Sequence, residues 1–106
     1  MEHSVSVCDP ALVTEAVVWW TGWRRNSWPI RDNATLVERF GEDAAVDLLP
    51  AVKVLEDDFY ASEARHRAPT LTEMGQQAAA DFRTVHPEVS EDAVRALAWC
   101  YTFDFK

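Results

Sequence analysis

Few residues of this chain stand at spacings that catalysis or metal binding requires, and the nearest approach is a Glu-x-x-His pair. On a helix, Glu63 and His66 would lie on one side, and carboxylate-bridged di-iron bundles use this spacing in duplicate. The second copy is missing, because Arg83 stands three residues before His86. Arginines on both sides of His66 would also repel a cation. We therefore interpret the pair as an exposed helix end.

Other patterns of metal, nucleotide and nucleophile chemistry are absent from the sequence. It contains no Cys-x-x-Cys, His-Glu-x-x-His or EF-hand pattern, and its 3 glycines are isolated instead of gathered in a phosphate-binding loop. Cys100 stands in an apolar segment, where burial would raise the pKa of a thiol and suppress its reactivity. We therefore predict no catalytic residue, no metal ligand and no cofactor-binding residue, which makes an enzyme the least favoured class.

The net charge of the chain limits the classes of partner that it is expected to bind. The chain has 18 acidic and 10 basic residues, a net charge of -8, which disfavours binding to the phosphate backbone of nucleic acids. No stretch approaches the roughly 18 consecutive apolar residues of a membrane span, and the first residues lack the features of a signal peptide. We expect a cytoplasmic protein that binds neither nucleic acid nor membrane, with Cys8 and Cys100 as reduced thiols in preference to a disulfide.

The length and the periodicity of apolar residues predict the fold class. One hydrophobic core fits 106 residues and two do not, so we predict a single helical domain over residues 1–106. Its architecture should be all-α, a compact array of five or six short helices. Pro50 interrupts the third helical pattern and predicts either a kink or two abutting helices. The start signals are Asp9-Pro10, Asp32 or Asn33, Glu42-Asp43, the capping box Thr70-Leu71-Thr72-Glu73, and Ser90.

The C-terminal segment fits two periods. A strand would align Trp99, Tyr101, Phe103 and Phe105 on one face, whereas a helix places Tyr101 on one side and Trp99 with Phe103 on the other. The serine cap at the start of the segment favours a helix through about Tyr101. The alternative for the last residues is a short two-stranded pairing with the N-terminal segment, residues 4–8.

Aromatic side chains supply the candidate contact residues. Three indoles share the apolar side of the first helix and are expected in the core. Trp28 stands in a loop, and Trp99 and Phe103 occupy the second face of the last helix. If one chain cannot bury them, these three define a contact surface or a pocket. Arg24 and Arg25 are expected to cover indole faces and to satisfy carbonyls at a helix end.

A second candidate surface is the acidic run Glu56-Asp57-Asp58. Adjacent residues point around a helix, so a solvated face is the default interpretation. Glu56 and Asp57 are nevertheless candidates for an acidic docking patch, together with Asp47 and Glu63, toward a basic partner.

The leading hypothesis is a small acidic protein-interaction module, such as an inhibitor, an immunity-type protein or a regulator. It would contact a protein partner or a second copy of itself. The alternative is a small-molecule-binding helical domain, with a Trp-lined apolar cavity between the first and last helices.

Overall fold

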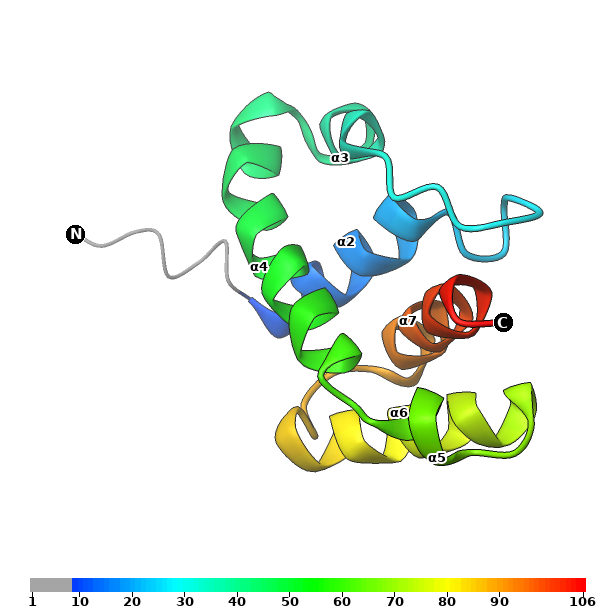
Figure 1. The fold of residues 1–106 in the computed structure, drawn as a ribbon. Helices are drawn as coiled ribbons and strands as arrows, with labels where there is room; N and C mark the ends of the chain where they lie inside the picture. The colour runs from blue at the N-terminus through cyan, green and yellow to red at the C-terminus, as the bar shows by residue number, and fades with distance from the viewer. Residues whose placement is uncertain (1–8) are drawn as a thin grey trace.

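The computed structural model describes residues 9–106, and over this range it contains α-helices and no strand (Figure 1). Five helices have eight residues or more, and a single-turn helix, α5, joins two of them. The all-α architecture of five or six helices is therefore confirmed. The helices are α2 (Pro10–Thr21), α3 (Asn33–Phe40), α4 (Glu42–Tyr60), α5 (Ala64–Arg67), α6 (Leu71–Val85) and α7 (Glu91–Asp104).

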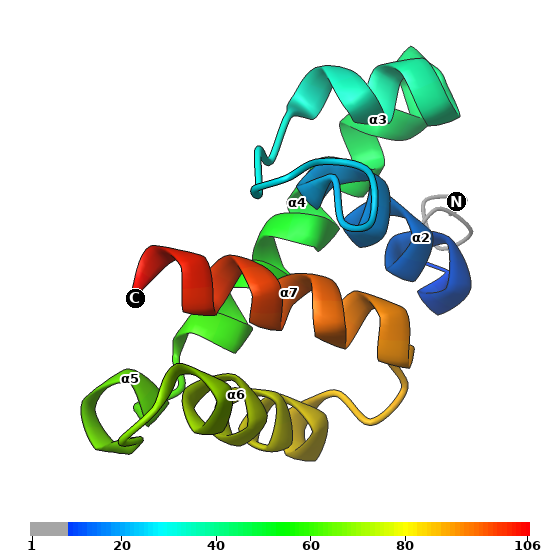
Figure 2. The ribbon, with the colours of Figure 1, turned by 90° about the vertical axis from the view of Figure 1, so that its right-hand side faces the viewer.

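The longest helix, α4, contacts α2, α3, α6 and α7. Figure 2 shows α7 in front of α4, with α2 above it and α6 below it. Every helix of eight residues or more contributes to the core between them. Its fully buried side chains include Val17, Leu36, Leu48, Val52, Phe59, Phe82, Val94, Leu97 and Tyr101. None of the described helices is both long and apolar enough to cross a membrane.

Four of the predicted helix starts are confirmed by side-chain caps, and α4 begins at Glu42 as predicted but without a side-chain cap. Asp9, Thr70 and Ser90 accept hydrogen bonds from backbone N–H groups in the first turns of α2, α6 and α7. Of the two alternatives for α3, Asp32 is the cap. Asn33 is the first helical residue, and its side-chain amide oxygen Oδ1 accepts a hydrogen bond of 2.9 Å from the Trp20 indole N–H.

The apolar pattern of the first helix continues past Gly22 to Trp23, and it predicts a longer helix than the structure contains. Gly22 instead ends the helix, in the left-handed conformation at φ 79°. Glycine suits this position because it has no Cβ to clash there. Arg25 donates to the carbonyl of Trp19 and lies 4.1 Å from the centre of its ring, as the sequence predicted. Of the three indoles on this apolar side, Trp20 is buried, whereas Trp19 and Trp23 are half-buried.

Pro50 lies inside α4 without dividing it, so a single helix is found where two abutting helices were one alternative. Proline lacks an N–H and leaves the carbonyl four residues earlier without its helical partner. Here that residue is Val46, on the exposed side of the helix. A water molecule can therefore donate to the carbonyl oxygen of Val46 in place of the missing N–H.

The C-terminal segment is helical as far as Asp104, which corrects two expectations. The helix does not end near Tyr101, and residues 102–104 are not extended. The two-stranded pairing is not supported, because residues 9–106 contain no strand and residues 4–8 lie outside the described range. Tertiary contacts explain the longer helix. The Tyr101 hydroxyl donates to the carbonyl of Ser62, and Asp104 accepts two hydrogen bonds from Arg31.

Candidate functional site

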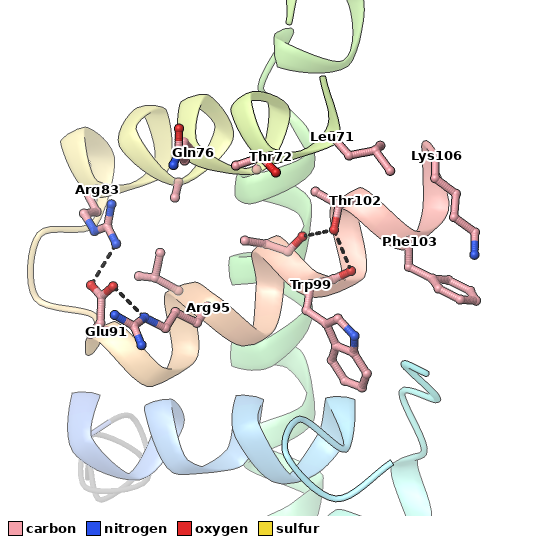
Figure 3. Close-up of a pocket in the computed structure, with 14 residues that line it drawn as sticks. Leu71, Thr72, Gln76, Arg83, Glu91, Arg95, Trp99, Thr102, Phe103 and Lys106 are labelled. Atoms are coloured by element: carbon pink, nitrogen blue, oxygen red, sulfur yellow. Dashed lines mark hydrogen bonds and ion pairs between the residues drawn. The ribbon is translucent and has the colours of Figure 1, made fainter. Parts of the chain in front are cut away.

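A groove of about 730 Å³ runs between α6 and α7 and is open to solvent (Figure 3). Its floor consists of small residues, among them Gly75, Ala79 and Ala98. A Cβ atom on residue 75 would lie only 3.1 Å from the methyl group of Thr102. The absence of a side chain at Gly75 therefore lets the two helices pack closely, and the larger residues beyond the floor form walls.

Half of the residues that line the groove are polar or charged, and the apolar part includes two aromatic residues. Leu71, Trp99 and Phe103 line the groove toward the start of α6 and the end of α7. Figure 3 shows the indole of Trp99 pointing from α7 toward the side of α2. Trp99 is half-buried, and Phe103 keeps 38% of its surface exposed. Large apolar side chains at an open surface are available for burial by a binding partner.

Cations mark both ends of the groove. At one end, Arg83 and Arg95 donate to the two carboxylate oxygens of Glu91 over 2.7 and 3.0 Å. These hydrogen bonds, first from Arg83 and then from Arg95, hold the pKa of Glu91 below its ordinary value. At the other end, the Lys106 ammonium lies 4.4 Å from the centre of the Phe103 ring. Three cations and one carboxylate thus line a groove in a chain whose net charge is -8.

The structure brings together two of the five candidate contact residues. Trp99 and Phe103 line the same groove, whereas Trp28 is exposed in the loop between α2 and α3. Glu56 and Asp57 lie on α4. Asp57 is exposed, but the Glu56 side chain is only 15% exposed and pairs with Arg31 and Lys53.

Sequence patterns did not single out Leu71, Arg83 or Arg95. Their place in the groove depends on how α6 and α7 align, which no local pattern specifies. A signal was present in the small residues of α6, since Gly75 and Ala79 recur on one face of that helix. Such a face predicts close helix packing, with larger groups standing at its edges.

No family model, curated protein or solved structure matches this chain. The groove is therefore interpreted from its own geometry and charge.

A second polar cluster, the Arg31 cluster, joins the loop before α3 to the ends of α4 and α7. Arg31 donates two hydrogen bonds to Asp104, over 3.0 and 3.2 Å, and one to the Tyr60 hydroxyl. Burial lowers the pKa of Arg31, but the hydrogen bond to Asp104 and nearby negative charge raise it above its ordinary value. Burial and Asp104 raise the pKa of Tyr60. These groups therefore stay protonated and act as fixed donors.

Cys100 lies beneath this cluster and is buried with a free thiol. Burial is the main cause that raises the pKa of Cys100 to about 12, as the apolar surroundings in the sequence predicted. A thiol with this pKa carries almost no thiolate at neutral pH and is a poor nucleophile.

His86 ends α6 between two carboxylates. Its Nε2 lies 2.6 Å from an oxygen of Asp58 on α4, and its Nδ1 lies 3.2 Å from an oxygen of Glu88. The Glu-x-x-His pair, Glu63 and His66, is exposed around α5. Within residues 9–106, no three His, Cys, Asp or Glu side chains are grouped as a metal ion would need.

Proposed function

We propose that this chain is a protein-interaction module that binds a segment of a partner protein in the groove between α6 and α7. The observation that carries this proposal is the open groove with the large apolar residues Leu71, Trp99 and Phe103 among its lining. Aromatic residues dominate the binding energy of protein interfaces when a partner buries them. A groove between two helices also suits a helical segment that presents one apolar face.

The length of the groove supports the proposal that the bound segment is a short helix. Nine residues separate Arg95 from Asp104, the last residue of α7, which corresponds to about 14 Å of helix at about 1.5 Å per residue. The groove therefore accommodates about two and a half helical turns of a partner. A cytoplasmic location and an inhibitor, immunity-type or regulatory role are part of the same proposal. The small size and acidity of the chain support them.

The second candidate function is small-molecule binding. It is favoured by the groove's volume of about 730 Å³ and by the presence of Trp99 among its lining residues. The open form of the groove and its single indole favour a protein segment instead. Tryptophan fluorescence against a ligand library separates the two functions, since a ligand in the groove should shift emission in the wild type and not in Trp99→Phe.

Selection of peptides from a displayed library against the folded chain tests the proposal. We expect enriched peptides that share apolar residues at helical spacing. Their binding should weaken at least about 10-fold in Phe103→Ser, because removal of an interface aromatic costs about 2 kcal/mol.

Val85→Ser is the matched control, since Val85 is also apolar, is 65% exposed and lies on α6 outside the groove. Peptides should bind this variant as they bind the wild type. A selection without enrichment, or peptides that bind Phe103→Ser with unchanged affinity, would contradict the proposal.

A further inference from the structure

The outer side of α4 carries a stripe of exposed residues, some of them apolar and some of them acidic. Val46 is 71% exposed and Val54 is 54% exposed. Residues four apart on a helix stand above one another, so Val46, Pro50 and Val54 form one apolar line. Asp43 and Asp57 stand beyond the two ends of this line, and Asp47 lies beside it. The α4 stripe consists of Asp43, Val46, Asp47, Pro50, Val54 and Asp57, all exposed.

The α4 stripe and the groove have complementary patterns. The stripe has an aspartate at each end and three apolar residues between them, with Asp47 beside them. The groove has cations at each end and a mixed apolar and polar middle. The end aspartates of the stripe, Asp43 and Asp57, are about 21 Å apart along α4, and the stretch of α7 from Arg95 to Asp104 is about 14 Å long. The sign of the end charges is complementary, and the stripe extends beyond the stretch of α7 that it faces.

We infer that the groove binds the α4 stripe of a second copy of this chain. This inference rests on the proposed function, because the same groove is the site. Val46 and Val54 of one copy pack against Trp99 and Phe103 of the next. The aspartates at the two ends of the stripe meet the arginine pair at one end of the groove and Lys106 at the other.

The two surfaces lie on different sides of the molecule. The stripe faces away from the core, and α7 packs on the opposite side of α4 (Figure 2). A copy whose stripe is occupied keeps its own groove open, so the contact is head-to-tail and further copies can add. Contacts of one helix in one groove are small, so association is expected between about 10 μM and about 1 mM.

The overall charge does not prevent this contact. Two chains of net charge -8 repel at long range, but at an ionic strength of about 0.15 M charges separated by more than about 8 Å are largely screened. Ion pairs formed within the contact are closer than this distance. Measurements should therefore use about this salt concentration.

The test is the mass of the full chain in solution, by light scattering and sedimentation, from about 10 μM to about 1 mM. The groove variant is Leu71→Ser with Phe103→Ser, and the stripe variant is Val46→Ser with Val54→Ser. All four positions are exposed, and circular dichroism confirms that each variant folds. The wild type and the control Val85→Ser should increase in mass with concentration, and each double variant should stay monomeric.

Mixing the two double variants is decisive. One intact stripe and one intact groove remain, so an equimolar mixture should form a one-to-one complex and nothing larger. A wild type that stays monomeric, a double variant that associates as the wild type does, or a mixture that stays monomeric would overturn the inference. If the chain stays monomeric while selected peptides still bind in a Phe103-dependent way, only the second copy is excluded and the groove still binds other proteins.

Discussion

The side chain of Arg31 holds together parts of the chain that are distant in sequence. Its backbone has φ 58°, a left-handed conformation that is unfavourable for a residue with a Cβ atom. Its guanidinium compensates through hydrogen bonds to Asp104 on α7 and Tyr60 on α4. The side chain is 25% exposed, so these charge-assisted bonds are only partly screened by water. We conclude that the contacts of this side chain maintain the unfavourable backbone.

Two replacements of Arg31 separate the contribution of its hydrogen bonds from the cost of its backbone conformation. Arg31→Ala should lower the free energy of unfolding by about 1.5–3 kcal/mol, because hydrogen bonds to a charged group are lost. Arg31→Gly loses the same bonds but relieves the backbone, so it should be less destabilised than Arg31→Ala by about 1 kcal/mol. Urea unfolding measures both. Equal stability of the two variants would show that the backbone is not strained.

Arg67→Ala is the control for an exposed ion pair. Arg67 is 60% exposed and lies 3.9 Å from Asp81. Exposed pairs contribute little, so the change should stay within about 0.5 kcal/mol. A larger loss than that of Arg31→Ala would contradict the importance given to the Arg31 cluster.

His86 makes stability depend on pH. Burial lowers its pKa, but hydrogen bonds to Asp58 and Glu88 raise it, and the net result lies above the ordinary 6.5. The fold therefore stabilises the protonated ring. This contribution is complete below about pH 6.5 and is lost as pH rises through the pKa of the folded state. In His86→Gln the free energy of unfolding should fall less between about pH 6 and about pH 8 than in the wild type.

Urea unfolding across this pH range checks the sign of the change in the free energy of unfolding with pH. His66→Gln, at an exposed position on α5, is the control and should keep the wild-type dependence on pH. A wild type whose stability rises across the range relative to His86→Gln would show that the neutral ring is the stabilised form.

Among the elements, α7 shows how much of the fold can be read from local sequence. Its Ser90 cap, like those of α2 and α6, is a short-range signal and was predicted. The end of α7 was not, because Tyr101 and Asp104 are fixed by residues 39 and 73 positions away in sequence. Trp99 and Phe103 were recognised as a second helix face. The partner face on α6 was missed, since its alignment with α7 is set by packing.

The Tyr101 hydroxyl couples α7 to α5. It donates to the carbonyl of Ser62 over 2.9 Å and accepts from the N–H of Arg65 over 3.0 Å, and the residue is fully buried. Tyr101→Phe should lower the free energy of unfolding by about 1–3 kcal/mol, because buried backbone groups lose their partner. Urea unfolding measures this loss. A loss below about 0.5 kcal/mol would mean that water or a neighbour replaces the hydroxyl.

At the scale of the whole molecule, charge is distributed unevenly over one helical core. The acidic surplus is concentrated in part on the outer side of α4, while cations stand at both ends of the groove. The net charge of -8 alone would favour a basic partner. At the groove, the cations favour acidic groups on the partner instead. This local preference arises from the way the helices pack and could not be read from the composition.

The central claim is that partners bind in the groove between α6 and α7. The most direct measurement is nuclear magnetic resonance of the isotope-labelled chain during titration with a selected peptide. The indole signal of Trp99 and the backbone signals of Gly75 and Phe103 should shift, while the indole of the buried Trp20 should not. Shifts confined to Trp28 and its loop, or to residues outside the groove, would contradict the claim.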